Sequence, residues 1–375
     1  MPEILIVGAG IGGLTAAIGL RRIGRSVSVI EKATTLGEVG AGLSLWPNAL
    51  RALDELGVGE AVRAAGVSAV SRGGLRRPSG QWLRHRHPDD IPVLMVHRAD
   101  LHRTLLDALP ADCVRTNATV TEVKQATGGV DVMYRTHDGI RQKEAELVVA
   151  ADGVHSTVRQ QLWPETTKAC FDGRSTWRAV TDGILEPAEE AITLARDQQF
   201  GLLPLPNGRL YWFLTAAVER QGIRYDDELG EVRRRVGHWH DPIPGILAVT
   251  APSAVLHHDI TTLAPLETYV SGRVVLLGDA AHAQSPDLGQ GACQAIEDAV
   301  VLASALATEH DLDSALERYD QERRPRTQTI AQAAQRQAKL TQANFWAMTS
   351  AARLLPRSLW RRQTARWVDW SPPSL

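Results

Sequence analysis

Three short segments of the chain carry residue types that could hold a nucleotide cofactor. The first, Gly8-Ala9-Gly10-Ile11-Gly12-Gly13, follows an apolar run, and Glu31 comes 23 positions after Gly8. Glycines allow a tight turn and let the backbone approach a pyrophosphate at a helix N-terminus, while a carboxylate accepts hydrogen bonds from ribose hydroxyls. The spacing predicts a dinucleotide site; the alternatives are a glycine turn without ligand and a solvated Glu31. The residues assigned to this site are Gly8, Gly10, Gly12, Gly13 and Glu31.

The second and third segments each place an aspartate beside glycine at the end of an apolar run. Asp152-Gly153 is weak evidence alone, because an aspartate often caps the helix that follows it. In the third segment, Gly278-Asp279 is followed by a proline-bearing turn and then by a helix that begins after Gly289. That order puts a carboxylate where ribityl hydroxyls could lie, and it aims a helix N-terminus at an anionic group such as a reduced flavin ring.

These segments need a parallel sheet to bring them together. Residues 4–7 and 27–30 are short β-branched runs separated by residues with helical spacing, which is the pattern of a β-α-β unit. Residues 147–151 and 274–277 are further apolar runs. We expect both to be parallel strands of the same sheet, with their C-terminal ends facing a ligand.

An inserted, mainly antiparallel substrate domain is predicted between these strands. Residues 175–185 and 209–215 carry aromatic and β-branched residues in partial alternation. After Gly289 the apolar spacing is helical towards the C-terminus, and Pro325 and Pro356 are expected to break or kink the helices. The residues expected to line the substrate pocket are Trp177, Tyr211, Trp212 and Phe213.

The composition is that of an ordinary globular protein of 375 residues, 44% of them hydrophobic. A formal net charge of -2 gives no field that would hold nucleic acid or an anionic membrane. Three widely spaced cysteines without a Cys-x-x-Cys pair favour a reducing cytoplasm over a zinc site or a disulfide framework. No signal peptide and no membrane-spanning run is expected, so we predict a cytoplasmic monomer or homodimer without metal.

The three segments, in this order, resemble the marks of the group A flavoprotein monooxygenases, the family with the para-hydroxybenzoate hydroxylase fold. The resemblance covers nearly the whole chain, because residues 40–48, residues 97–101 and Trp177-Arg178 also look like family segments. Within the family the chain is similar to the salicylate hydroxylase and urate hydroxylase type. The resemblance implies an α/β fold, in which a Rossmann-like FAD-binding domain carries an inserted, mainly antiparallel β-sheet substrate domain and is followed by C-terminal helices.

The resemblance also implies that the chain crosses between these parts several times. We expect the FAD-binding domain to comprise residues 1–70, 98–165 and 269–310. The substrate domain would comprise residues 71–97 and 166–268, and residues 311–375 would form a C-terminal helical region.

The activity implied by the resemblance is hydroxylation of a small aromatic or heteroaromatic substrate with FAD, NAD(P)H and O2, through a hydroperoxide at the flavin C4a carbon. No second glycine-rich dinucleotide turn follows a strand, so we expect NAD(P)H to bind only transiently. One alternative is epoxidation or Baeyer-Villiger-type oxygenation of a larger natural product, and a remote one is a flavin-binding module without catalysis. A flavin halogenase is disfavoured, because the chain has no Trp-x-Trp-x-Ile-Pro segment.

The resemblance assigns roles to particular residues. Asp287, Tyr211 and Pro286 match positions beside the substrate or the flavin ring, although Asp287 could instead stabilise a loop and Tyr211 could simply pack. Urate is not the expected substrate, because Gln199 stands where urate-hydroxylating relatives place a substrate-binding arginine. Besides the glycine turn and Glu31, the residues implied to lie against FAD are Lys32, Ser44, Arg98, Val120, Asp152, Asp279, Gly289, Gln290, Gly291, Ala292 and Cys293.

Three further features each allow two interpretations. His97 and His282 could act as acid-base groups, but such histidines are more often structural. Cys293 lies near a helix N-terminus, which favours a thiolate, but packing against flavin is the preferred expectation. The C-terminal segment could lie on anionic lipid, but it is similar to family tails that pack back on the FAD domain, and we prefer that interpretation. Its basic and aromatic residues are Arg353, Arg357, Arg361, Arg362, Arg366, Trp346, Trp360, Trp367 and Trp370.

Overall fold

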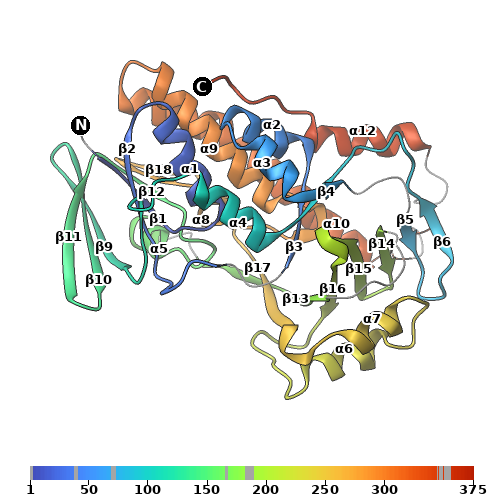
Figure 1. Ribbon diagram of the computed structural model, residues 1–375. Helices are drawn as coiled ribbons and strands as arrows, with labels where there is room; N and C mark the ends of the chain where they lie inside the picture. The colour runs from blue at the N-terminus through green and yellow to red at the C-terminus, as the bar shows by residue number, and fades with distance from the viewer. Residues whose placement is uncertain are drawn as a thin grey trace.

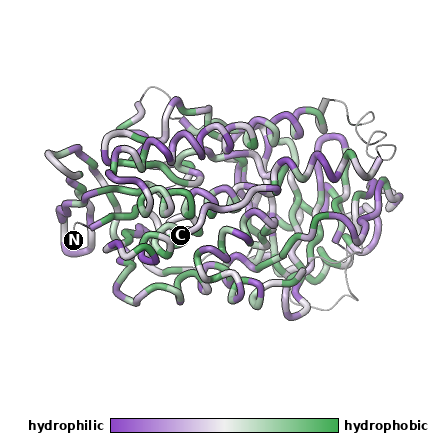
Figure 2. The backbone as a smooth tube through the Cα atoms, turned by 90° about the horizontal axis from the view of Figure 1, so that it is seen from above, coloured by the Kyte–Doolittle hydropathy of each residue, from purple (hydrophilic) through white to green (hydrophobic). Residues whose placement is uncertain are grey.

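The computed structural model describes residues 3–37, 41–68, 73–164, 168–181, 190–343, 345, 349 and 356–375. Gly40, the predicted strand beyond Thr181, and Trp346 and Arg353 of the C-terminal segment lie outside the described residues. Two large sheets occupy opposite halves of the molecule (Figure 1). Seen from above, apolar segments lie in the interior of both halves, whereas the outermost turns at the two ends are mainly hydrophilic (Figure 2).

A six-stranded sheet forms the core of the first half. Its strands are β1 (Glu3–Val7), β2 (Ser26–Ile30), β8 (Val114–Arg115), β12 (Leu147–Ala150), β18 (Val270–Ser271) and β19 (Val274–Leu276). β1 pairs in parallel with β2 and β12, and β12 pairs in parallel with β19, so the predicted parallel sheet is confirmed. β1, β12 and β19 are buried along nearly their whole length, which explains why they are almost continuous apolar runs.

A seven-stranded sheet forms the second half. Its strands are β5 (Gly73–Arg76), β6 (Trp82–His85), β13 (Cys170–Thr181), β14 (Glu190–Leu194), β15 (Gln198–Pro204), β16 (Leu210–Ala217) and β17 (Leu256–Thr262). Neighbouring strands are antiparallel except for β14 and β5, so the predicted inserted, mainly antiparallel sheet is also confirmed.

Two three-stranded sheets complete the β-structure. One contains β3 (Gly42–Leu45), β4 (Gly66–Ser68) and β7 (Leu94–His97), and the other contains β9 (Thr119–Ala126), β10 (Gly129–Thr136) and β11 (Gly139–Ala145). The first lies between the two large sheets, and the second projects from the end of the molecule that is remote from the seven-stranded sheet (Figure 1).

Helices cover both large sheets. The helices are α1 (Ile11–Arg22), α2 (Pro47–Glu55), α3 (Gly59–Ala64), α4 (Arg98–Asp107), α5 (Thr157–Leu162), α6 (Glu228–Val236), α7 (Ile243–Val249), α8 (Asp279–His282), α9 (Gly291–Thr308), α10 (Leu312–Ala343) and α12 (Arg357–Val368), and the short 3-10 turns are η2 (Pro206–Gly208), η3 (Pro252–Ala254) and η4 (Pro286–Leu288). Of the two outcomes predicted for Pro325, a break or a kink, the break does not occur, because α10 continues through this residue. Pro356 does mark a boundary, since it is the residue just before α12.

The two faces of the seven-stranded sheet have different partners. Trp177 and Trp212 pack under α6 and α7 in a separate core, so the prediction that they line the substrate pocket is wrong. Successive side chains of a strand point to opposite faces. Tyr211 and Phe213 therefore lie on the other face, where they join a cluster with Ala41 of the first half.

The C-terminal segment packs back on the first half of the molecule, as expected. Arg51 on α2 donates from Nε to the carbonyl oxygen of Trp370 at 2.8 Å and from Nη2 to that of Val368. Arg326 on α10 donates to the carbonyl oxygen of Trp367 at 2.9 Å. Within the part of the chain that the structure describes, no helix is long and apolar enough to cross a membrane.

Candidate active site

The glycine turn contacts the ends of two neighbouring strands. A Cβ atom on Gly8, whose φ is +102°, would lie 2.5 Å from the carbonyl oxygen of Ala151, and one on Gly13 would lie 1.9 Å from that of Gly8. A Cβ atom on Gly12 would lie 2.8 Å from Cδ2 of Leu277. Only glycine fits at residues 8 and 13, where the close atoms are backbone, and these contacts show that the turn sits directly against the ends of β12 and β19.

Two side chains hold the turn in place. The Glu31 carboxylate accepts hydrogen bonds from the backbone N–H of Ala9 at 2.7 Å and of Ala33 at 2.8 Å. His102 Nε2 bonds to the carbonyl oxygen of Ala9 at 2.7 Å. Glu31 was predicted for this region, whereas His102 was missed, because nothing in its spacing distinguishes it from any other buried helix residue.

Asp152 both caps a helix and keeps a carboxylate oxygen available for a ligand, the two roles considered for it from the sequence. Its Oδ2 atom accepts from the backbone N–H of Thr157 at 2.8 Å and of Val158 at 3.3 Å, so it does cap α5. Its Oδ1 atom is buried and has no hydrogen-bond partner among the described residues. Burial raises the pKa of Asp152. The carboxylate therefore keeps an acceptor beside the glycine turn.

The third predicted segment lies beside the second, because they follow the neighbouring parallel strands β19 and β12. Gly278 has a φ of +63° and turns the chain so that α8 begins at Asp279, whose side chain is exposed. Buried Arg159 donates to the carbonyl oxygen of Ala280 at 2.8 Å and so ties the two segments together. Arg98, at the start of α4, faces Asp279: burial lowers its pKa, and the charge of Asp279 opposes that shift.

The helix N-terminus predicted after Gly289 meets β3. Gly289 has a φ of +61°, and a Cβ atom there would lie 3.2 Å from Nε1 of Trp46 and 3.9 Å from Cβ of Ser44. Cys293 donates its thiol proton towards the carbonyl oxygen of Ser44 at 3.6 Å. Burial raises the pKa of Cys293 to about 12, which disfavours the thiolate that the sequence left as the alternative to packing.

The remaining expected cofactor residues lie near the same edge of the six-stranded sheet, the edge where its parallel strands end. Lys32 is exposed directly after Glu31, and Val120 is buried on β9. The backbone N–H of Ala118, which precedes β9, donates to the carbonyl oxygen of Glu31 at 2.9 Å. Gln290, Gly291 and Ala292 form the start of α9.

The polar groups left over at this edge fit a flavin nucleotide. Besides Asp152 Oδ1, the buried Nε1 of Trp46 and both amide atoms of Gln284 have no hydrogen-bond partner among the described residues. Cβ atoms built on Gly10 and Gly291 would meet no atom within 4 Å. Buried polar groups need partners, and open glycines let a ligand approach the backbone. The residues present therefore suit a ligand with a pyrophosphate and a polar ring.

Tyr211 lies beside this edge on the seven-stranded sheet. Its ring packs on Gly42, where a Cβ atom would lie 2.4 Å from Cδ1 of Tyr211. Burial raises the pKa of Tyr211, although Arg178 and Arg98 lie near enough to oppose the shift. Gln199 lies on the same face as Tyr211, because its neighbour Phe200 points into the core under α6.

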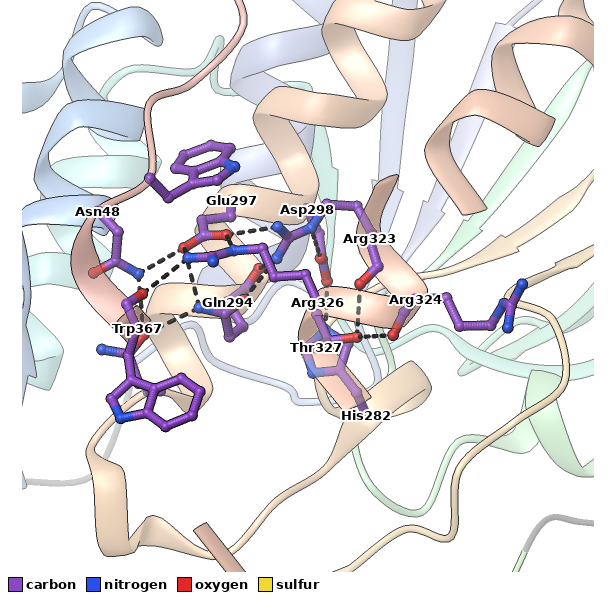
Figure 3. Close-up of polar contacts among 12 residues, drawn as sticks. Asn48, His282, Gln294, Glu297, Asp298, Arg323, Arg324, Arg326, Thr327 and Trp367 are labelled. Carbon is purple, nitrogen blue, oxygen red and sulfur yellow. Dashed lines mark hydrogen bonds and ion pairs between the residues drawn. The ribbon is translucent and has the colours of Figure 1, made fainter. Parts of the chain in front are cut away.

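A second group of buried charges joins α9 to α10 (Figure 3). Arg323 donates to Asp298 Oδ1 at 2.7 Å and to Glu297 Oε2 at 2.5 Å. Asp298 Oδ2 is 2.6 Å from Nε2 of His282 and accepts from the backbone N–H of Gly278 at 3.0 Å. Asn48 donates to Glu297 at 2.6 Å. His282 is thus a structural partner that fixes α8, not a free acid-base group.

These charges make folding stability depend on pH. Burial alone would raise the pKa of Asp298, but its contacts with His282 and Arg323 outweigh burial and lower the pKa to about 2. An unfolded aspartate has a pKa of about 3.9, so this stabilisation is present above about pH 4 and is lost as the pH falls towards about 2. We expect urea unfolding of Asp298→Asn to depend less on pH in that range than unfolding of the parent protein does. Equal slopes of the unfolding free energy against pH for the two proteins would contradict this explanation.

Comparison with known proteins identifies the class. The FAD binding domain family matches residues 1–334. Aurachin C monooxygenase/isomerase of Stigmatella aurantiaca is 38% identical over 84% of this chain and 83% of that protein. FAD-dependent urate hydroxylase of Klebsiella pneumoniae is 30% identical over 93% of each chain. The structure of Klebsiella pneumoniae HpxO with FAD and uric acid superposes with a TM-score of 0.90, at 27% identity over 99% of this chain and 97% of that one.

The glycine turn, the two aspartate segments and the inserted sheet define an FAD-dependent oxidoreductase. The chain belongs to the FAD binding domain family and, within it, to the group A flavoprotein monooxygenases. The predicted family, fold class and cofactor are therefore confirmed.

Proposed function

We propose that this monooxygenase uses NAD(P)H and O2 to hydroxylate a small aromatic or heteroaromatic compound. When bound, FAD takes a hydride from NAD(P)H and activates O2, so that one oxygen atom enters the substrate and the other leaves as water. The observation that supports the proposal most is the convergence of the glycine turn, Asp152, Asp279 and the start of α9 on one edge, opposite the apolar Tyr211 face.

In this proposal the protein's own residues bind FAD and orient it. We assign the pyrophosphate to the glycine turn and the start of α1, and ribose hydroxyls to Glu31. The free Oδ1 of Asp152, exposed Asp279 and Arg98 are placed to hold the rest of the cofactor. The start of α9 directs its N–H groups at the ring, where they stabilise negative charge. The assigned flavin contacts also include Lys32, Ser44, Val120, Gly289, Gln290, Gly291, Ala292 and Cys293.

The two halves of the molecule have different roles in the proposed function. We propose that residues 1–70, 98–165 and 269–310 bind FAD, that residues 71–97 and 166–268 bind substrate, and that residues 311–375 support the first part. Pro286, Asp287 and Tyr211 stand where these parts meet: Tyr211 orients the substrate, and η4 holds the ring from the other side. Water is excluded by the apolar cluster around Tyr211, which limits loss of reducing equivalents as peroxide.

Urate is not the substrate that we propose. Gln199 faces the Tyr211 side of the sheet with an uncharged amide, and a neutral amide binds an anion more weakly than a guanidinium does. The relative named aurachin C monooxygenase/isomerase favours a second candidate, oxygenation of a larger natural product with epoxidation or ring insertion.

Consumption of NADH and NADPH by the purified protein tests this function, with phenols, aromatic acids, heteroaromatics and aurachin C as substrates and peroxide measured in parallel. We expect at least one compound to accelerate consumption while peroxide falls below the amount of cofactor oxidised. Product masses separate hydroxylation from the second candidate. Consumption that no compound accelerates would support a flavin-binding module without catalysis.

We further propose a cytoplasmic monomer or homodimer. Cys113, Cys170 and Cys293 are free thiols, which is consistent with a reducing compartment where NAD(P)H is supplied. Sedimentation of the purified protein measures the oligomeric state.

A further inference from the structure

A buried ion cluster joins the seven-stranded sheet to the turn that precedes α9. Arg174 on β13 donates from Nη2 to Asp287 Oδ2 at 2.8 Å and from Nη1 to Asp287 Oδ1 at 3.1 Å. The same guanidinium donates to Asp172 Oδ2 at 2.7 Å and to Ser285 Oγ at 2.6 Å. The side chains of Arg174 and Asp287 are only 7% and 6% exposed.

The backbone of β13 is shaped to deliver this arginine. The pairing of β13 with β17 shifts register between Phe171 and Ser175, and Gly173 has a φ of +88°. At this bulge Asp172 Oδ1 accepts from the backbone N–H of Arg174 at 3.0 Å. Bulges commonly re-aim a side chain beside an active site. Here the bulge fixes Arg174 by its backbone as well as by its side chain.

The cluster holds two carboxylates that would otherwise repel each other. Burial alone would lower the pKa of Arg174, but its pairs with Asp287 and Asp172 outweigh burial and raise the pKa. Burial raises the pKa of Asp172, and the nearby charge of Asp287 acts in the same direction. Removing the guanidinium would leave two buried carboxylates facing each other, which is more costly than removing the whole cluster.

The turn held by this cluster leads directly into the proposed flavin contacts. Asp287 lies within η4, and Gly289, in the left-handed conformation, follows it before α9 begins. A Cβ atom on Gly289 would lie 3.2 Å from Nε1 of Trp46, so a small displacement of η4 would change the contacts made at the start of α9.

We propose that Arg174 is a positioning residue that ties the substrate sheet to the flavin-contacting turn, with Asp287 as its anchor rather than a proton acceptor for the substrate. This inference rests on the proposed function, because that function places flavin at residues 286–291. The sequence left open whether Asp287 acts on the substrate or stabilises a loop, and this inference assigns it the second role.

The test compares Arg174→Met, Asp287→Asn and the double variant, each reconstituted with FAD. The readouts are the dissociation constant for FAD and the absorbance and circular dichroism of the bound flavin, none of which needs turnover. We expect Arg174→Met to weaken FAD binding by about tenfold or more, equivalent to about 1.4 kcal/mol, and to alter the flavin spectrum. The double variant should bind FAD better than Arg174→Met, because no like charges remain to repel.

Arg224→Met is the matched control. Arg224 pairs with Asp259 of β17 at 3.6 Å, but its side chain is 51% exposed, so this variant should keep the parent spectrum and affinity. Arg174→Lys, which retains the charge, should lie between the parent and Arg174→Met.

Two results would overturn the inference: an unchanged flavin spectrum and affinity in Arg174→Met, or a double variant no better than Arg174→Met. Where Arg174→Met does not fold, Arg174→Lys takes its place, and a flavin spectrum and affinity equal to the parent's in that variant would overturn the inference. A parent protein that takes up no FAD would contradict the proposed function itself, which separates the two failures.

Discussion

Gly13→Ala is expected to abolish FAD binding at ordinary concentrations. The new Cβ atom would lie 1.9 Å from the carbonyl oxygen of Gly8 and 3.0 Å from its carbonyl carbon, and both are backbone atoms that cannot rotate away. Either the turn opens or α1 shifts, and both changes move the N–H groups that we assign to the pyrophosphate. We expect affinity for FAD to fall by a factor of about one hundred or more, which corresponds to about 3 kcal/mol.

Flavin absorbance after gel filtration and a titration of apoprotein with FAD measure this effect. Gly245→Ala is the control, because this exposed glycine lies within α7 and a Cβ atom there meets nothing within 4 Å. Alanine stabilises a helix interior relative to glycine by about 1 kcal/mol, so the control should fold and bind FAD as the parent does. Normal FAD binding by Gly13→Ala would mean that the glycine turn does not hold the nucleotide.

Arg323→Met is expected to cause the largest loss of folding stability. Arg323 is 1% exposed, and its partners Glu297 and Asp298 are 0% exposed, so the substitution leaves two carboxylates buried beside each other. Arg326 still pairs with Glu297 at 2.7 Å, but the atom that Arg323 contacts on Asp298 loses its cation. Breaking a buried ion pair from one side costs about 3–5 kcal/mol.

The midpoint of urea unfolding measures this loss. Arg318→Met is the matched control, because Arg318 also belongs to α10 and pairs with Glu322 at 2.8 Å, but both side chains are partly exposed. An exposed pair of this kind contributes about 0–1 kcal/mol. Similar losses in the two variants would show that burial of the Arg323 cluster does not matter for stability.

The parallel sheet could be predicted from the sequence because β1, β12 and β19 are short apolar runs, each followed by a glycine within three residues. The cofactor edge could be predicted for the same reason: Asp152 and Asp279 each follow such a strand, and parallel strands end at one edge. The face to which each side chain of the antiparallel sheet points was harder to predict. Trp177 and Tyr211 were assigned to one pocket, although the pairing register places them on opposite faces.

The contacts that sequence reasoning missed are long-range ones. Arg174 and Asp287 are 113 positions apart, and Arg323 joins Asp298 across 25 positions between two helices. No local pattern predicts which arginine a buried carboxylate will meet. Pro325 does not break α10 for a related reason, because Arg323 and Arg326 on either side of it are held by contacts with α9 that its local sequence does not reveal.

We propose above that the protein, with FAD bound, transfers one oxygen atom from O2 to an organic substrate. The most direct test is a single turnover of the FAD-loaded protein with NAD(P)H and an accelerating substrate under isotopically labelled O2, followed by mass spectrometry of the product. We expect a product that carries one labelled oxygen atom and is formed only when the reduced nicotinamide is present. An oxygen atom derived from labelled water, or NAD(P)H oxidation that yields peroxide alone with every substrate, would contradict this proposal.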